Sequence, residues 1–325
     1  MERRIQIERQ NRQNRQARQE RQVEERAFIE RFENKVKKTI KEYDLISKND
    51  KVVVACSGGK DSSTVLYLLN KFGYNVRAVM IDLLIGKWSE QNLLNVRGFC
   101  KEQGIKLRVI NIREELGYSM CYIRSSIQAS EKLNNCSICG PIRRWLLNKA
   151  ARALKADKLA TGHNLDDEAE SVLMNIFKGN MASLLNLGPK PGLLTDKKFV
   201  QRIKPLYFCT NDEIKRYAMA KAFPVLYAPC PCRVNSFRVY VRAILARLAE
   251  KNPEIKLNLV RNVLRILPWL KQEAKREIES SGQGLRYCKS CGEPSRGELC
   301  KSCQLIRMIK ASTTSTKTST KMLDA

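Results

Sequence analysis

Four cysteines near the C-terminus have the spacing of a metal site. They follow the pattern Cys-x2-Cys-x8-Cys-x2-Cys, and they are Cys288, Cys291, Cys300 and Cys303. Two such pairs closing on one ion are the usual ligands of a tetrahedral structural zinc site. We therefore predict a zinc ribbon with four cysteine ligands over residues 285–308, with an iron–sulfur site as the minor alternative.

A further pair, Cys136 and Cys139, lies in mid-chain and precedes a predicted helix that carries Arg143 and Arg144. Two thiolates can hold one metal centre but cannot fill four positions. More ligands could come from Cys230-Pro-Cys232, which lies in a proline-rich loop. Three thiolates on a 4Fe-4S cluster would leave one iron without a protein ligand, and sulfide could bind there as a nucleophile. Two unrelated cysteine pairs, one of them redox-active, are the alternative.

A phosphate-binding loop is predicted at Ser57-Gly58-Gly59-Lys60-Asp61-Ser62, between a predicted strand and a predicted helix. Glycine lets backbone N–H groups approach a phosphate closely, and the helix N-terminus adds partial positive charge. The usual P-loop pattern, Gly-x4-Gly-Lys-Ser/Thr, is absent. A plain tight turn is the alternative, but the six residues in this context favour a phosphate loop.

The motif Gly162-His-Asn-Leu-Asp-Asp-Glu168 also follows a predicted strand and opens a helix. Its carboxylates could simply be partners of the helix dipole. Its place beside the phosphate loop favours a functional reading, in which Asp166 could help to bind Mg²⁺. His163 is the only histidine, which excludes multi-histidine metal sites, and we expect it to be structural.

Short apolar segments alternate with helical patterns between residues 51 and 177. We predict strands at 51–55, 76–81, 107–110 and 158–161, and helices at 61–72, 89–103, 141–154 and 166–177. This alternation indicates a parallel α/β sheet with helices on both faces. Ligands of such sheets bind at the carboxyl ends of the strands, so the loops after Ala55, Ile81 and Thr161 should meet at one edge.

The segments around this sheet divide the rest of the chain. We expect a charged helical arm at 1–45, exposed up to residue 24 and then carrying an apolar stripe of Phe28, Phe32, Val36 and Ile40. The α/β domain would cover 46–235, including a helix opened by a capping box of Thr210 and Glu213. A helical extension at 236–284, kinked or broken at Pro268, the ribbon, and a disordered tail at 309–325 would follow.

Composition points to a polyanionic partner. The formal net charge is +27, from 60 Lys and Arg against 33 Asp and Glu, so nucleic acid is the first candidate and a membrane surface the second. No apolar run is long enough to span a bilayer, and the N-terminus lacks the apolar core of a signal peptide. We therefore expect a cytoplasmic location, where twelve cysteines indicate metal or redox chemistry instead of disulfides.

Taken together, these motifs resemble those of TtuA-type tRNA 2-thiouridine synthetases, part of the TtuA/TtcA group in the PP-loop ATP pyrophosphatase superfamily. The matching features are the phosphate loop, Cys136-x2-Cys139-Gly-x2-Arg143, the Gly162 motif, and Cys230-Pro followed by Ser236-Phe-Arg. The resemblance covers about residues 45–305 and implies a PP-loop domain, adenine nucleotide alpha hydrolase-like in fold. TtuA-type proteins usually also carry an N-terminal finger built on four cysteines, whereas this chain has no cysteine before Cys56.

The resemblance also implies roles for individual residues. Cys136, Cys139 and Cys230 would hold a 4Fe-4S cluster, with Cys232 as the runner-up third ligand. Asp167 would be a catalytic acid or base, with Arg143 and Lys60 as cationic catalytic residues. The residues implied to bind ATP are Ala55, Cys56, Ser57, Gly58, Gly59, Lys60, Asp61, Ser62, Ile81 and Gly162.

The implied reaction is tRNA thiolation. ATP would adenylate the C2 oxygen of a tRNA uridine, and sulfur on the open iron would attack C2 and expel AMP. The implied cofactors are ATP, Mg²⁺, the cluster and Zn²⁺, the donor would be sulfide or a thiocarboxylated ubiquitin-like protein, and a homodimer is expected. Three alternatives stay open: 2-thiocytidine synthesis, a PP-loop ligase or amidotransferase without a cluster, and a zinc-dependent RNA-binding module with a vestigial nucleotide site.

Overall fold

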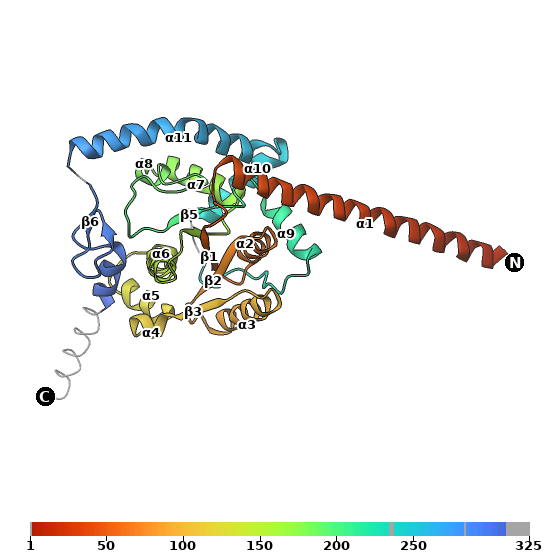
Figure 1. Ribbon diagram of the computed structural model, residues 1–325, viewed down its shortest axis with the longest axis horizontal. Coiled ribbons are helices and arrows are strands. Elements are labelled where there is room, and N and C mark those ends of the chain that lie inside the picture. The colour runs from red at the N-terminus through yellow and green to blue at the C-terminus, as the bar shows by residue number, and fades with distance from the viewer. Residues whose placement is uncertain (1, 234–236, 283, 310–325) are drawn as a thin grey trace, which may run out of the picture.

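The protein is built around one parallel sheet (Figure 1), seen in a computed structural model that describes residues 2–233, 237–282 and 284–309. The five strands have the order β3-β2-β1-β4-β5. They are β1 (Lys51–Cys56), β2 (Asn75–Asp82), β3 (Leu107–Asn111), β4 (Lys158–Ala160) and β5 (Gln201–Ile203). The chain runs outward from β1 to β3 and then returns to β4 beside β1, so the strand order reverses between β1 and β4. Ligands of open α/β sheets bind at such a reversal.

Alternate side chains of β1 face opposite layers of helices. Val52 and Val54 pack with α2 (Lys60–Lys71), α3 (Gly86–Glu102) and α9 (Asn211–Ala220) on one face. Val53 packs with α6 (Asn135–Ala153) on the other. The predicted α/β class and its four strands are confirmed. The fifth strand was not predicted, because three residues with two polar side chains carry no strand pattern.

The N-terminal arm is one helix, α1 (Glu2–Glu42), which projects from the body of the protein (Figure 1). Its last part carries the predicted stripe of Phe28, Phe32, Val36 and Ile40, all of them buried. Phe32 stacks on Tyr217 of α9 with ring centroids 4.6 Å apart, which fixes this end of the arm to the domain.

The predicted start of helix α6 was wrong, and the helical extension is not broken at Pro268. Helix α6 begins at Asn135 and not at Pro141, so Cys136 and Cys139 lie on the helix instead of before it. Asn134 starts it early, because its side chain accepts a hydrogen bond from the N–H of Ser137 at 2.9 Å. Helix α11 (Ile255–Ser280) continues through Pro268. Its buried stripe extends to Leu267, and burial of that face outweighs the one hydrogen bond that proline removes.

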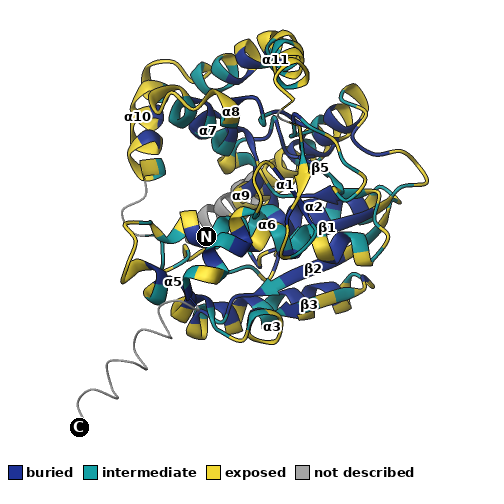
Figure 2. Ribbon diagram, turned by 90° about the vertical axis from the view of Figure 1, so that its left-hand side faces the viewer, coloured by how far each residue is buried: buried dark blue, intermediate teal, exposed yellow. Residues whose placement is uncertain are grey.

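The remaining helices are short connectors or pack outside the sheet. They are α4 (Ile112–Leu116), α5 (Met120–Gln128), α7 (Leu165–Phe177), α8 (Met181–Leu184) and α10 (Phe237–Lys251). Helices α10 and α11 contact α7 and keep exposed outer faces (Figure 2). The predicted capping box of Thr210 and Glu213 is present at α9. No described helix is long and apolar enough to cross a membrane.

The ribbon is fixed to α6 and to the segment before β5. Its strands are β6 (Arg286–Tyr287) and β7 (Pro294–Ser295). Glu293 accepts hydrogen bonds from Arg152 and Asn148 of α6, and Lys198 donates to the carbonyl of Gly292 at 2.6 Å. The ribbon therefore forms a wall of the domain. The predicted disordered tail lies, beyond residue 309, outside the described residues.

Candidate active site

The loop between β1 and α2 closes on itself around Ser62. The N–H of Ser57 donates to the Ser62 hydroxyl at 3.1 Å, and that hydroxyl donates to the carbonyl of Gly59 at 3.1 Å. Gly58 has a φ of +81°, and a Cβ there would collide with the buried side chain of Asn92. No side chain caps the N-terminus of α2, so its first N–H groups are left for a ligand. Such a helix end is an anion site.

The loop after β4 lies directly against this one. A Cβ on Gly162 would stand 2.8 Å from both the carbonyl carbon of Asp61 and the nitrogen of Ser62. The side chain of Asn164 donates to Asp61 at 3.0 Å. Asn164 also caps α7 in a capping box with Asp167. The two loops predicted to meet are therefore in backbone contact.

Asp167 lies half-buried at the start of α7, with its side chain 30% exposed. Burial raises the pKa of its carboxyl to about 6, and the nearby Asp61 and Glu170 act in the same direction, whereas Arg238 opposes the shift. The Arg238 guanidinium lies 3.8 Å from the carboxylate. Asp167 thus changes charge near neutral pH, as a general base or acid must. Arg238 belongs to the Ser-Phe-Arg motif, and its place beside Asp167 was not predicted.

Two cavities meet beside the phosphate loop. The larger one, of about 810 Å³, is lined by residues that include Ser57, Asp61, Gly162 and Asp167. The smaller one, of about 60 Å³, is lined by Cys56, Met80, Ile81, Leu83 and Trp88, among others. Its apolar walls suit an adenine ring. The residues shared by both cavities are Ala55, Ser57, Arg143 and Leu147. Cys56 is buried, and burial raises the pKa of its thiol.

Two charged residues named from the sequence are engaged elsewhere. Lys60 donates to Asp61 at 2.8 Å and to Asn211 at 2.6 Å, and it lines neither cavity. Asp166 pairs with Lys256 at 2.6 Å and accepts from the N–H of Asn211 at 2.7 Å. Lys60 thus stays on Asp61 of the phosphate loop without facing either cavity, and Asp166 faces α9 and α11.

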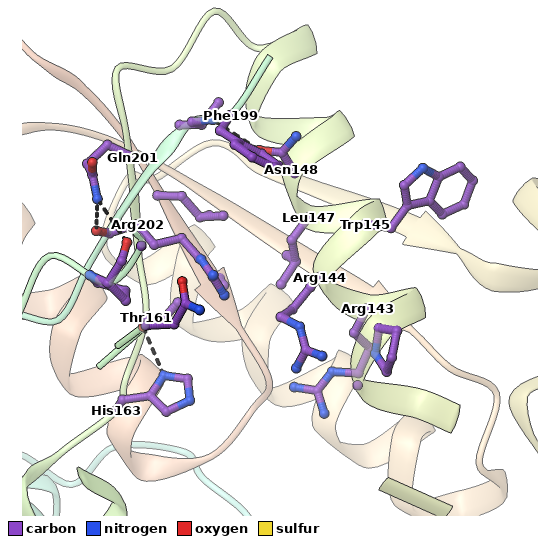
Figure 3. A pocket seen from close by; sticks show the side chains of 18 of the residues that line it. Arg143, Arg144, Trp145, Leu147, Asn148, Thr161, His163, Phe199, Gln201 and Arg202 are labelled. Carbon is purple, nitrogen blue, oxygen red and sulfur yellow. Dashed lines mark hydrogen bonds between the residues drawn. The ribbon is translucent and has the colours of Figure 1, made fainter. Parts of the chain in front are cut away.

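His163 lines the larger cavity and shares a hydrogen bond with Thr161 at 2.9 Å (Figure 3). The side chain is exposed toward the cavity, where desolvation lowers the pKa of its imidazole and surrounding cations, Lys204 first among them, act in the same direction. The ring is therefore neutral at physiological pH, in keeping with a structural role.

The mid-chain cysteines lie next to the nucleotide cavities. Cys139 lies one turn before Arg143 on α6, and Arg143 lines both cavities. Cys139, Cys230 and Cys232 pack against one apolar cluster, although they are far apart in sequence. Burial raises the pKa of the Cys139 thiol, and Arg143 opposes that shift.

The two cysteines of the Cys-Pro-Cys loop have different neighbours. Cys232 is hydrogen-bonded to Arg124, a buried residue that also donates to Cys121 at 3.2 Å. Cys230 interacts electrostatically with Cys139. These contacts favour Cys230 over Cys232 as the partner of the mid-chain pair.

The ribbon cysteines form a ready metal site. The sulfur atoms of Cys288, Cys291, Cys300 and Cys303 all lie within 4.8 Å of one another. Within the described part of the chain, no other group of three or more Cys, His, Asp or Glu is gathered in this way. Cys136 is exposed, so Cys136, Cys139 and Cys230 would need side-chain rotation to close on one cluster.

Three arginines line the larger cavity. Arg143 and Arg144 come from α6 and Arg202 from β5, and their guanidinium groups turn toward the same space (Figure 3). Arg144 was visible in the sequence next to Arg143. Nothing in the sequence marked Arg202 as a residue of the site, because it lies on β5, the short strand that was not predicted.

A glycine loop at the reversal of a parallel sheet, without the usual P-loop pattern, defines a PP-loop nucleotide-binding protein. Residues 28–247 match the family described as PP-loop domain, and the chain belongs to this family. A tRNA-5-methyluridine(54) 2-sulfurtransferase of Pyrococcus horikoshii is 36% identical over 280 residues, 86% of each chain. Cytoplasmic tRNA 2-thiolation protein 1 of Caenorhabditis elegans is 30% identical over 89% of this chain and 75% of its own.

A solved structure also matches. The U34-tRNA thiolase NcsA from Methanococcus maripaludis, with its [4Fe-4S] cluster, superposes with a TM-score of 0.70 at 33% identity. The match covers 86% of this chain and 88% of that one. The recognised family and the α/β fold are therefore confirmed.

The contact at Gly162 can be tested with one methyl group. Gly162→Ala should raise the Kd for ATP at least about tenfold, about 1.4 kcal/mol, because the added Cβ pushes the β4 loop away from the phosphate loop. Gly98→Ala is the matched control, since nothing lies within 4 Å of a Cβ at that helical position. Calorimetric titration with ATP measures both, and equal affinities would contradict the proposed fit.

Proposed function

We propose that this chain is an ATP-dependent tRNA 2-sulfurtransferase that converts a uridine to 2-thiouridine. The observation that carries the proposal is the position of Arg143, which lies one turn after Cys139 on α6 and lines both cavities beside the phosphate loop. A sulfur site and a nucleotide site thus meet on one helix. The relatives named as tRNA 2-sulfurtransferases, and the thiolase with its [4Fe-4S] cluster, support this reading.

ATP would occupy both cavities. The adenine ring fits the apolar walls around Ile81 and Trp88, and the triphosphate reaches the free N–H groups at the start of α2. Arg143 is placed to stabilise the negative charge that develops on the α-phosphate. Mg²⁺ would accompany the triphosphate, with Asp61 as the nearest carboxylate of the loop.

The mid-chain thiols fit an iron–sulfur cluster by their chemistry. Cys136, Cys139 and Cys230 would hold it, because soft thiolates are the usual ligands, Cys136 and Cys139 lie on one turn of α6, and Cys139 and Cys230 pack against the same apolar cluster. When bound, a cluster with three cysteine ligands supplies an iron atom that can carry sulfide. Cys232, which packs against the same cluster, stays the runner-up third ligand.

Asp167 is assigned the proton transfers. As an ionised carboxylate it can take the N3 proton of uridine while the C2 oxygen bonds to the α-phosphorus and pyrophosphate leaves. It can return the proton once sulfide has replaced that oxygen and AMP has left. Desolvation and neighbouring cations lower the pKa of His163 and keep it neutral, so the histidine does not compete for the proton.

The partners follow from charge and reaction. A net charge of +27 suits tRNA, whose phosphates would make binding strongly salt-dependent. The sulfur donor would be sulfide or a thiocarboxylated ubiquitin-like protein. A homodimer, zinc in the ribbon and a cytoplasmic location are parts of the same proposal, and the relatives described as cytoplasmic tRNA thiolation proteins support the last of these.

Thiolation itself is tested with protein purified and reconstituted without air. We expect 2-thiouridine and one AMP per modified base from unmodified tRNA, ATP and sulfide, detected by mass spectrometry of nucleosides. 2-Thiocytidine would favour the cytidine enzymes, and tRNA binding without AMP release would favour an RNA-binding module. Cleavage of the product into fragments locates the uridine, since the relatives include both U54 and U34 enzymes.

Metal counting distinguishes the two sites. Cys139→Ala and Cys230→Ala should lose iron and keep zinc, whereas Cys300→Ala should lose zinc and keep iron. Cys232→Ala should keep both metals, because Arg124 engages that thiol. Iron and zinc are measured by mass spectrometry of the intact metal-loaded proteins. If Cys232→Ala lost iron and Cys230→Ala kept it, Cys232 would be the third ligand.

The pKa of Asp167 predicts the pH profile of the first chemical step. Below about pH 6 the carboxyl is protonated, so the rate of pyrophosphate release in a single turnover should fall about tenfold per pH unit there and be constant above that pH. Asp167→Asn should be slower by about 10²–10⁴-fold, and its rate should no longer fall below pH 6. Rapid-quench assays between pH 5 and 8 measure both. A variant whose rate still falls below pH 6 as in the wild type would show that Asp167 is not the general base.

A further inference from the structure

The far half of the larger cavity has chemistry that ATP does not use. Beyond the phosphate loop its walls are α6, the segment before β5 and the ribbon. Arg144 and Arg202 lie on these walls, with Phe199, which is 43% exposed, and Lys301 of the ribbon. Guanidinium, aromatic and ammonium groups in one cleft are the chemistry with which proteins hold unpaired RNA nucleotides.

Arg144, which is exposed, and Arg202, which is half-buried, both line the cavity without a counter-ion. No carboxylate of residues 2–233, 237–282 and 284–309 forms an ion pair with either of them. Desolvation within the cleft lowers the pKa of both guanidinium groups, and their mutual repulsion contributes to the shift of Arg144. Like charges held together in a cleft destabilise the free protein unless an anion binds between them.

The triphosphate of ATP does not account for this pair. It is already provided with the N–H groups of α2 and with Arg143, which is the only one of the three arginines that also lines the adenine cavity. Arg144 follows it on α6, and Arg202 lies opposite on β5 (Figure 3). The forked shape of a guanidinium suits two oxygens of one phosphate.

We propose that Arg144 and Arg202 clamp a backbone phosphate of the tRNA next to the uridine that is thiolated. This inference rests on the proposed function, because it places the target nucleotide between the clamp and Asp167. The two arginines hold the target nucleotide in the cavity after its base has unstacked from its neighbours in the tRNA. Phe199 offers an aromatic face on which a base can stack. Pyrophosphate, the reaction product, is the other phosphate that could reach these arginines.

The test uses the full-length, metal-loaded protein with both arginines changed to glutamine. Arg144→Gln/Arg202→Gln should weaken tRNA binding at least about tenfold and lower the slope of log K against log salt by about 0.7–0.9, the value for one lost phosphate contact. The affinities for ATP and pyrophosphate should stay within twofold. Arg108→Gln, an exposed residue of β3, controls for loss of charge and should leave tRNA binding unchanged.

Two further measurements, the thermal midpoint and the tRNA affinity of a lysine variant, distinguish phosphate binding by Arg144 and Arg202 from a structural role. Removing two repelling charges should leave the thermal midpoint of the free protein unchanged or higher. Arg144→Lys/Arg202→Lys keeps the charge but loses the fork, so its tRNA affinity should lie between those of the wild type and the glutamine variant. A lower thermal midpoint in the glutamine variant would make the pair structural and overturn the proposal.

The remaining outcomes are equally distinct. Unchanged tRNA binding in the glutamine variant would overturn the clamp, while thiolation by the wild type would leave the proposed function standing. Loss of pyrophosphate or ATP affinity, with tRNA binding intact, would assign the arginines to the nucleotide and also overturn it. Absence of 2-thiouridine with the wild-type protein would instead overturn the function, whatever the variants show.

Discussion

The site depends on one close approach of two backbones. The loops after β1 and β4 touch where Gly162 faces Asp61 and Ser62, and no other residue fits there. This contact sets how far Asp167, at the start of α7, stands from the phosphate loop. Helix α7 is held at this distance from the phosphate loop, because its buried Glu168 pairs with Lys204 at 2.6 Å. A buried charge pair is costly to break. The pair of Glu168 and Lys204 therefore fixes the position of the neighbouring Asp167.

Helix α6 transmits this geometry to the rest of the site. Its first turns carry Cys136 and Cys139, its middle carries Arg143, and its last turns hold the ribbon through Asn148 and Arg152. A continuous helix rises by about 1.5 Å per residue, so the separations along it are set once the helix is packed. The sulfur site, the nucleotide cavity and the ribbon are therefore spaced by a single element, which explains why the ribbon can close the cavity without touching the phosphate loop.

Sequence reasoning succeeded where a local pattern carries the information. Glycine spacing, strand alternation and cysteine pairs were enough to place the phosphate loop, the central strands and the ribbon cage. It missed the local cap at Asn134, which starts α6 ahead of the cysteines. It missed Arg202, because that residue lies on a strand defined only by its pairing with β4. Tertiary contacts also decide that α11 stays unbroken at Pro268, where the sequence left a kink or a break open. The hydrogen bond from Lys60 to Asn211 joins residues far apart in the sequence, and the catalytic role of Lys60 stays a prediction.

The charges of the site show what it is built to receive. Arg124, Arg143, Arg144 and Arg202 surround the cysteines and the cavity, and none of them forms an ion pair with a carboxylate of the described residues. Arg124 is buried and donates to the carbonyl of Met120 and to the thiol of Cys121. Cations kept in this way raise the free energy of the empty protein, and anionic ligands remove that penalty when they bind. A triphosphate, a tRNA phosphate and thiolates would each neutralise a different one, so the same repulsion that destabilises the free protein favours the state in which all the reactants are present together.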